Sequence, residues 1–297
     1  MKEKLIIIGG PTASGKTGYS IELAKKLDGE IVSCDSMQIY KYMDIGSAKP
    51  TEEEMQGIPH HMIGVIDPCV SFSVADYYPM ATNCIDDILR RGKQPILCGG
   101  TGLYINAIIN GLDFDDVDVD EAFRDELWKR YEASDAETIH SMLRECDPEM
   151  ADKIHPNNVK RVIRAIEYFH TTGEKLSDYQ KRTQTEKRGK YLYELYGIDM
   201  PRELLYERIN KRVDIMIDDG LIDEVKSLLY EHNVPISATA MQGIGYKEIA
   251  NAIINGTSIA EAIETVKQES RRYAKRQLTW FRRYKEMEWI DYARKPI

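Results

Sequence analysis

No apolar run in this sequence is long enough to cross a membrane. Its apolar stretches are short, such as residues 5–8 and 107–109, whereas a membrane-spanning helix needs about 20 apolar residues. The amino-terminal segment has only about four apolar residues before a glycine pair, too few for the core of a signal peptide. These absences argue against membrane insertion and secretion, and we expect a cytoplasmic protein.

Cysteine is scarce, and basic residues are outnumbered by acidic ones. There are five cysteines and no C-x-x-C spacing, so neither a zinc site nor a disulfide framework is predicted. Lys and Arg number 40 against 49 Asp and Glu, a net charge of −9, which by itself argues against a nucleic-acid-binding protein. The 297 residues, 42% hydrophobic and 30% charged, have the composition of a globular protein with one large domain or two ordinary ones.

Short apolar strands alternate with amphipathic helices in the first part of the chain. Strands are predicted at residues 4–8, 30–36, 60–66 and 95–98, and helices at residues 17–27, 73–91 and from about 102 to 110. Strands that alternate with helices at this spacing are typical of a parallel α/β sheet. We therefore predict a P-loop NTPase-like parallel sheet flanked by helices.

The pattern changes after Gly111. Residues 112–121 carry six carboxylates in ten positions, and the chain from there to residue 188 has only helical signals. A strand is predicted at residues 191–200, followed by a long amphipathic helix or a helix pair broken near Gly220. We predict two domains: a catalytic core of residues 1–112 and 190–297, and an all-helical insertion of residues 113–189.

A glycine-rich loop lies between the first strand and the first helix. Its sequence fits G-x-x-x-x-G-K-[ST], the P-loop pattern, in the context that this motif requires. Backbone N–H groups of such a loop bind phosphate oxygens, and the following helix adds the positive end of its dipole. The motif is typical of nucleotide- and ATP-binding proteins and predicts a polyphosphate without saying which one. The predicted phosphate-binding residues are Gly10, Pro11, Thr12, Ala13, Ser14, Gly15, Lys16 and Thr17.

The acidic residue expected in a P-loop kinase is missing from its usual place. A carboxylate should end an apolar strand and help to hold Mg²⁺, but the strand at 95–98 ends in Gly-Gly-Thr. An acid follows the second strand instead, as Asp35, either at a ligand site beside the phosphate loop or as a simple turn residue. Thr101 has two interpretations as well, an N-cap hydroxyl or a ligand contact.

Two basic segments stand out in this acidic chain. Residues 153–190 contain ten Lys and Arg against four acids, and residues 267–285 contain eight against one, with aromatic residues interleaved. Basic and aromatic residues on a helix suit a phosphate backbone with exposed bases, although a solvated helix face is the ordinary alternative. The segments favour nucleic acid about as much as they favour that alternative.

A third group of cations lies on the predicted helix after the 191–200 strand. Arg208 and Arg212 are four residues apart and share one face of that helix. Two guanidinium groups on one face can bind a pyrophosphate, or can pair with acidic residues of the same helix. His60 and His61 have no partners at metal-ligand spacing, and a turn or core role is expected for them.

Several motifs together resemble one family, the tRNA dimethylallyltransferases (tRNA isopentenyltransferases). The resemblance covers nearly the whole chain in the correct order. It rests on GPTASGKT (10–17), SCDSMQIYKYMDIGSAKP (33–50), GGTGLY (99–104), IHPNNVKRVIRAIE (154–167), RI-x-x-RVD-x-M (208–216), GL-x-x-EV (220–225), QGIGYKE (242–248) and KRQLTWFR (275–282).

The resemblance implies a Mg²⁺-dependent prenyl transfer by a monomer. The exocyclic N6 amine of the adenine 3′ of the tRNA anticodon attacks dimethylallyl diphosphate, and pyrophosphate leaves. The phosphate loop would hold the donor's diphosphate, so no phosphoryl group is transferred and the missing acid is accounted for. The implied partners are the tRNA anticodon stem-loop and dimethylallyl diphosphate, with no membrane involved.

The resemblance also implies roles for single residues. Asp35 matches the carboxylate that bonds the adenine amine and acts as general base, and Thr17 matches the hydroxyl ligand of Mg²⁺. Thr101 matches a threonine near the reacting centre, and Arg212 a pyrophosphate ligand, with Arg208 as a second candidate. The implied tRNA contacts are Asp35, Ser36, Met37, Gln38, Thr101, Arg124, Lys160, Arg161, Val162, Ile163, Arg164, Gln242, Gly243, Gly245, Tyr246, Lys247, Lys275 and Arg276.

Three other functions compete with this one. A prenyltransferase acting on free adenine nucleotides would need the phosphate loop and Asp35 but not the basic segments. A small-molecule kinase would need the missing strand-end acid. A non-catalytic RNA-binding module would not need Lys16, Thr17 and Asp35 together.

Overall fold

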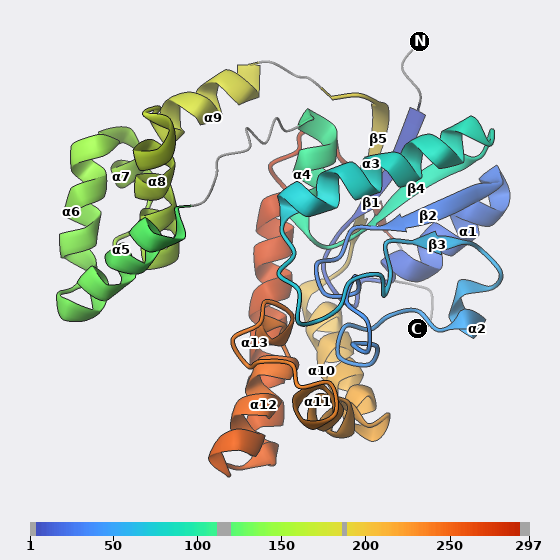
Figure 1. Cartoon of the computed structure of the whole chain (residues 1–297). Coiled ribbons are helices and arrows are strands. Elements are labelled where there is room, and N and C mark those ends of the chain that lie inside the picture. Colours follow the sequence, from blue (N-terminus) through green and yellow to red (C-terminus); the bar gives the residue numbers. More distant parts are fainter. Residues whose placement is uncertain (1–3, 112–119, 186–188, 292–297) are drawn as a thin grey trace. The chain divides into compact units, whose positions relative to one another are not determined.

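The computed structural model describes residues 4–111, 120–185 and 189–291 and divides the chain into two compact units (Figure 1). One unit is formed by the residues up to Ile109 and from Lys190 onward, and the other runs from Asn110 to Gly189. The predicted boundary at residues 112 and 113, most of the acidic segment 112–121, and the basic residues Lys187 and Arg188 lie outside the described residues.

The first unit is built on a six-stranded sheet in which every pairing is parallel. The strand order is β3-β2-β4-β1-β5-β6, which confirms the predicted α/β sheet. The strands are β1 (Lys4–Gly9), β2 (Gly29–Ser33), β3 (His60–His61), β4 (Gln94–Gly99), β5 (Leu192–Asp199) and β6 (Glu288–Asp291). Because the strands are parallel, their carboxyl ends lie at one edge of the sheet, where such sheets bind ligands.

Alternating side chains of β1 fill the two faces of the sheet. Leu5 and Ile7 belong to the core cluster that includes residues of helices α3 (Val74–Arg90) and α4 (Gly102–Asn110). Ile6 and Ile8 pack in a cluster that includes residues of α1 (Lys16–Leu27). All four are nearly inaccessible, as the period of two along a strand requires when both faces are covered. Figure 1 shows α1 and α3 on opposite sides of the sheet.

The helices of the first unit follow local signals in the sequence. Ser73 and Asp76 form a capping box at the start of α3, which satisfies two N–H groups at that end. Gly220 takes a left-handed conformation, φ +103°, between α10 and α11, so the predicted break there is confirmed. The helices are α1 (Lys16–Leu27), α2 (Glu52–Met55), α3 (Val74–Arg90), α4 (Gly102–Asn110), α10 (Arg202–Asp218), α11 (Leu221–Tyr230), the 3₁₀ turn η1 (Ala240–Gln242), α12 (Tyr246–Asn255) and α13 (Ile259–Phe281).

The second unit contains only helices in its described residues. These are α5 (Glu121–Ala133), α6 (Ala136–Cys146), α7 (Pro148–Lys153), α8 (Val159–Thr172) and α9 (Leu176–Thr185). Their apolar faces enclose a separate core around Leu143, Val162 and Ala165. The buried Asp147 accepts hydrogen bonds from the N–H groups of Met150 and Ser177. One carboxylate thereby satisfies donors at the starts of both α7 and α9.

The sheet differs from the sequence prediction at its edges. The strand predicted over residues 60–66 is limited to His60–His61, because Met62 and Gly64 adopt positive φ angles that turn the chain away. His61 bonds the carboxylate of Glu30 and His60 bonds the carbonyl of Ile58, which confirms a structural role for this pair. Strand β6 was not predicted at all. Within the described ranges, no helix is both long and apolar enough to span a bilayer.

Candidate active site

The phosphate loop joins the end of β1 to the start of α1. Gly10 and Gly15 have φ angles of +148° and +93°, and Ala13 has one of +61°. Such values suit glycine and are uncommon for other residues. Gly15 is the N-cap of α1 and places no side chain over its first turn, so the N–H groups of that turn face the loop as an anion site.

Lys16 reaches back over its own loop, where its ammonium group donates to the carbonyl of Pro11 at 2.5 Å. Its pKa is lowered to about 8, mainly by burial and to a smaller extent by the charge of Arg212, while Cys98 and Asp35 act in the opposite direction. Burial has this effect because a low-dielectric environment disfavours the charged form of an amine. A diphosphate beside Lys16 would raise this pKa again, because an adjacent anion favours the charged form of an amine.

Two hydroxyl groups of the loop fit a phosphate ligand and its metal ion. The Oγ of Ser14 is fully buried and has no hydrogen-bond partner among the residues that the structure describes, an unusual state for a polar atom unless a ligand satisfies it. Thr17 is exposed in the first turn of α1. The described residues include no cluster of three or more His, Cys, Asp or Glu side chains that could hold a metal by itself. This donor set fits Mg²⁺, which commonly binds through substrate phosphates, water and few protein ligands.

Asp35 follows β2, where the chain passes beside the end of β4. The N–H of Cys34 donates to the carbonyl of Cys98 at 2.8 Å, and the N–H of Thr101 donates to the carbonyl of Cys34 at 3.1 Å. These two bonds continue the pairing of β2 and β4 beyond the last strand residues. Asp35 and Thr101 are therefore held at the same edge of the sheet as the phosphate loop.

The carboxylate of Asp35 uses one oxygen in a turn and leaves the other for a ligand. Its Oδ1 accepts from the N–H groups of Met37 at 2.9 Å and Gln38 at 3.4 Å, which confirms the turn interpretation. No other hydrogen bond reaches this carboxylate from the described part of the chain, so Oδ2 can accept from a ligand. Asp35 also opposes the lowering of the pKa of Lys16 and of Arg212, as a nearby negative charge must.

Thr101 supports the Asp35 loop from the neighbouring strand. Its hydroxyl accepts from the N–H of Ser36 at 3.0 Å, so this oxygen contacts another loop rather than only its own helix. A hydrogen bond with Thr101 also tends to lower the pKa of Tyr273, but burial, reinforced by Asp35, raises that pKa to about 12. The Tyr273 phenol is thus neutral at ordinary pH.

Arg212 approaches the same site from α10. It is partly buried, and burial lowers its pKa, while Glu54 and Asp35 oppose that shift. Arg208 lies one turn earlier on the same helix and is also partly buried. The phosphate loop, Asp35 and Arg212, which were predicted from separate motifs, therefore lie within electrostatic reach of one another.

The sequence analysis missed Gln277, which ties the phosphate loop to the β4 loop. Gln277 is 5% exposed on α13. Its Oε1 accepts from the N–H of Thr12 at 2.9 Å, and its Nε2 donates to the carbonyl of Gly100 at 3.0 Å. A Cβ at Gly100 would lie 2.1 Å from Nε2, so any larger residue there would displace the Gln277 amide from this position. A glutamine within the predicted basic helix was the only available signal.

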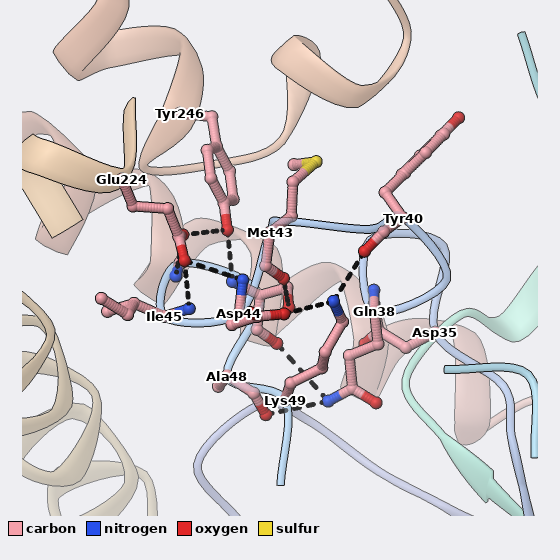
Figure 2. Close-up of polar contacts among 12 residues, drawn as sticks. Asp35, Gln38, Tyr40, Met43, Asp44, Ile45, Ala48, Lys49, Glu224 and Tyr246 are labelled. Carbon is pink, nitrogen blue, oxygen red and sulfur yellow. Dashed lines mark hydrogen bonds and ion pairs between the residues drawn. The ribbon is translucent and has the colours of Figure 1, made fainter. Parts of the chain in front are cut away.

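The loop after Asp35 is bound by two residues from distant helices, Glu224 on α11 and Tyr246 on α12 (Figure 2). The Glu224 carboxylate accepts from three consecutive backbone N–H groups, at 2.8, 2.8 and 3.1 Å. Those N–H groups belong to Asp44, Ile45 and Gly46. The Tyr246 hydroxyl donates to Glu224 at 2.6 Å. Sequence reasoning gave Glu224 no role and placed Tyr246 among RNA contacts.

The candidate RNA-binding residues of the second unit divide by burial. Lys160, Arg161 and Arg164 are exposed on α8. Val162 and Ile163 instead pack in the core of that unit, which corrects the expectation that their side chains face RNA: they hold the helix in place. The buried Glu167 pairs with Arg124 at 2.8 Å and with Arg164 at 3.0 Å.

The candidate RNA-binding residues of the first unit divide in the same way. Gln242, Lys247, Lys275 and Arg276 are exposed, and the Arg276 guanidinium lies 5.6 Å from the centre of the Tyr273 ring. Tyr246 is inaccessible, so its side chain supports the protein's own loop instead of facing a partner. Gly243 and Gly245 are buried beside it, and Ser36, Met37 and Gln38 are partly buried.

A glycine-rich loop at the carboxyl edge of a parallel sheet, with a carboxylate and an arginine close by, defines an α/β protein whose site suits a polyphosphate ligand. The family model described as IPP transferase matches residues 38–284, and a model described as isopentenyl transferase matches residues 3–64. The chain belongs to the IPP transferase family, the tRNA dimethylallyltransferases.

Individual relatives agree with this assignment. A tRNA dimethylallyltransferase of Bacillus mycoides is 51% identical over 292 residues, which cover 98% of this chain and 90% of that protein. The crystal structure of the full-length tRNA isopentenylpyrophosphate transferase of Bacillus halodurans matches with a TM-score of 0.72 at 47% identity, covering 98% of this chain and 90% of that one. A eukaryotic dimethylallyltransferase acting on tRNA matches with a TM-score of 0.79 at 31% identity, covering 97% of this chain and 74% of that one.

Proposed function

We propose that this chain transfers the dimethylallyl group from dimethylallyl diphosphate to the exocyclic N6 amine of the adenine 3′ of a tRNA anticodon. The observation that carries the proposal is the meeting of Asp35, Lys16 and Arg212 at one sheet edge, where Asp35 favours the charged form of both cations and Arg212 lowers the pKa of Lys16. A diphosphate-binding loop beside a carboxylate that can accept a proton is what this alkyl transfer requires.

The phosphate loop holds the leaving group. Its backbone N–H groups, Lys16 and the unpartnered hydroxyl of Ser14 bind the diphosphate oxygens, and Arg212 approaches from α10. Negative charge grows on the diphosphate as the C–O bond breaks, so preorganised cations and dipoles stabilise the transition state more than the ground state. Mg²⁺ bound through Thr17 would neutralise part of the same charge.

Asp35 receives the proton. The nitrogen lone pair of the adenine amine forms the new C–N bond while the C–O bond breaks, and the diphosphate oxygen takes that electron pair. The proton on nitrogen then passes to the Asp35 carboxylate, whose turn contacts with Met37 and Gln38 keep it at the sheet edge. An amine conjugated to a purine ring is a weak nucleophile, so removing its proton as the bond forms accelerates the reaction.

The tRNA supplies the acceptor in a form that this site can reach. An adenine in a single-stranded loop leaves its stack at small cost. The exposed cations on α8 and α13, Lys160, Arg161, Arg164, Lys275 and Arg276, would bind the phosphate backbone through sequence-independent electrostatics. The target base itself is then read by the Asp35 loop.

A radiolabel transfer assay tests the proposal. Labelled dimethylallyl diphosphate and Mg²⁺ are offered to unmodified tRNA, to AMP or ATP, and to no acceptor. Label in tRNA alone is the expected result. Label in the free nucleotide would make the protein a nucleotide prenyltransferase, and transfer to neither acceptor would contradict the proposal and restore the kinase hypothesis.

A further inference from the structure

Three consecutive backbone N–H groups bind one carboxylate in the loop that follows Asp35 (Figure 2). The donors are Asp44, Ile45 and Gly46, and both oxygens of Glu224 accept from them. Successive N–H groups that converge in this way form an anion-binding nest. A carboxylate held by several such bonds makes charge-assisted contacts of more than ordinary strength, so Glu224 anchors the loop to α11.

Tyr246 closes the same contact from α12. Its hydroxyl donates to Glu224 at 2.6 Å and accepts from the N–H of Ser47 at 3.0 Å. Burial, followed by the charge of Glu224, raises the pKa of this phenol well above its usual value. The hydroxyl therefore keeps its proton and remains a donor to Glu224.

The anchored segment is connected to Asp35 by a short chain of bonds. The side-chain amide of Gln38 donates to the carbonyls of Ala48 at 2.9 Å and Ser47 at 3.4 Å, and its oxygen accepts from the Ser33 hydroxyl at 3.0 Å. The backbone N–H of Gln38 donates to the Asp35 carboxylate. Gln38 thus joins the far part of the loop, where Glu224 and Tyr246 act, to the carboxylate at the sheet edge.

Close packing at two glycines reinforces these bonds. A Cβ at Gly46 would lie 2.6 Å from the Tyr246 ring, and one at Gly243 would lie 2.7 Å from the sulfur of Met37. Both distances are shorter than atoms tolerate without movement. The loop and the QGIGYKE segment are therefore closely packed, both at Gly46 and at Met37, which is two residues after Asp35.

We propose that Glu224 and Tyr246 are positioning residues that hold the Asp35 loop in the geometry needed to accept the adenine proton. This inference rests on the proposed function. It gives the GL-x-x-EV and QGIGYKE motifs a shared role, since the first supplies Glu224 and the second supplies Tyr246, and both residues bind the same loop. Neither residue touches the reacting atoms, so their effect on the rate passes through the loop.

Glu224→Gln tests the proposal, with Asp223→Asn as the matched control. The glutamine amide would keep the shape of the original side chain but would present N–H groups to backbone donors. Asp223 is a neighbour on α11 whose side chain is 81% exposed and pairs with Lys226, away from the loop. In single-turnover transfer to tRNA we expect Glu224→Gln to be about tenfold to a hundredfold slower, since small misplacements of a catalytic group have effects of this size. The KM for dimethylallyl diphosphate should stay within about twofold, and the control should match the wild type.

A second background separates positioning from general weakening. The second background is the Asp35→Asn enzyme, whose amide oxygen can still accept hydrogen bonds from the N–H groups of the turn. In it, Glu224→Gln should cause no further loss of transfer rate, because the carboxylate that Glu224 positions is already absent. A full additional loss in that background would overturn the proposal. So would a wild-type rate for Glu224→Gln, or an increase in the KM for dimethylallyl diphosphate that accounts for the whole effect.

Two further measurements keep the test decisive. Tyr246→Phe preserves the packing and removes only the hydroxyl, so it is the variant of choice if Glu224→Gln does not fold, and we expect a loss of the same kind. Hydrogen exchange of the amides of residues 44–47 should be faster in Glu224→Gln than in Asp223→Asn. Unchanged exchange would show that Glu224 does not anchor the loop, whether or not the wild-type protein modifies tRNA. Faster exchange together with a wild-type protein that does not modify tRNA would count against the proposed function alone.

Discussion

The phosphate loop and the loop that follows Asp35 lie at the same edge of one sheet, yet they are held in different ways. The phosphate loop takes its shape mainly from its own glycines and from Lys16, and Gln277 is a bracing residue from a distant helix. The Asp35 loop depends on bonds to residues 178 to 199 positions away. We therefore expect binding of the diphosphate to depend mostly on local sequence, and placement of the base to depend on the tertiary structure.

The largest effect should come from the carboxylate that the second loop positions. Asp35→Ala removes the proton acceptor, and we expect transfer to tRNA to fall by on the order of 10³-fold. The tRNA affinity should remain within a few fold, since the exposed cations lie elsewhere. Single-turnover labelling and a filter-binding assay measure the two quantities, and a turnover rate near that of wild type would remove Asp35 from the mechanism.

The brace on the phosphate loop should matter less. Gln277→Leu leaves the Thr12 N–H and the Gly100 carbonyl without their partner. Of these two groups only the Thr12 N–H belongs to the phosphate loop, so we expect the KM for dimethylallyl diphosphate to rise about tenfold, the effect of one lost hydrogen bond of ordinary strength on that loop. Gln268→Leu, at an exposed position of the same helix, is the control. If Gln277→Leu lowered kcat alone, the phosphate loop and the Asp35 loop would be less independent than the structure indicates, because a change at the first loop would then act on the chemical step.

The phosphate loop should also show its own pH dependence. Burial lowers the pKa of Lys16 to about 8, so its charge is present below pH 8 and is lost as the pH rises through that value. The affinity of the free enzyme for inorganic pyrophosphate should then decrease several-fold between about pH 7 and pH 9. Lys16→Arg keeps its charge throughout this range and should lose less affinity on raising the pH. Calorimetry compares the two proteins, and parallel pH profiles would show that Lys16 does not govern the binding.

The smallest effect should appear on the second unit, whose candidate contacts are exposed side chains of α8, among them Arg164, which also pairs with Glu167. Replacing Arg161 and Arg164 by Gln removes two cations, and the slope of log affinity for tRNA against log salt should decrease in magnitude by roughly 1.5. Arg144→Gln, on α6 of the same unit, is the control. An unchanged slope in the double variant would mean that α8 does not contact the tRNA backbone.

The parts of the site that were predictable share one property: their signal lies within a few neighbouring residues. The phosphate loop was visible because its glycines, Lys16 and the strand-to-helix context are contiguous, and Asp35 because it follows an apolar strand. Gln277 and Glu224 were not predictable in these roles. Each bonds backbone groups far away in the chain, and backbone groups leave no mark on the sequence.

The difference between local and long-range signals also explains why three buried side chains were predicted to contact RNA. Val162, Ile163 and Tyr246 lie within motifs shared with the family, but a motif does not state which of its members face inward. Helical periodicity on α8 could have separated Val162 from Arg161. No local pattern could have shown that the Tyr246 ring packs against Gly46, because these two residues belong to segments that are far apart in the sequence.

The sequence by itself determined the parallel α/β fold, the phosphate loop and the identity of the carboxylate at the end of β2, because hydrophobic period and short motifs encode them locally. The tertiary structure decided how these groups meet. It brought Asp35, Lys16 and Arg212 to one edge, placed Gln277 between two loops, and folded Glu224 and Tyr246 onto the Asp35 loop. The physical reason is that backbone N–H and carbonyl groups, identical at almost every residue, acquire specific partners only when distant elements pack together.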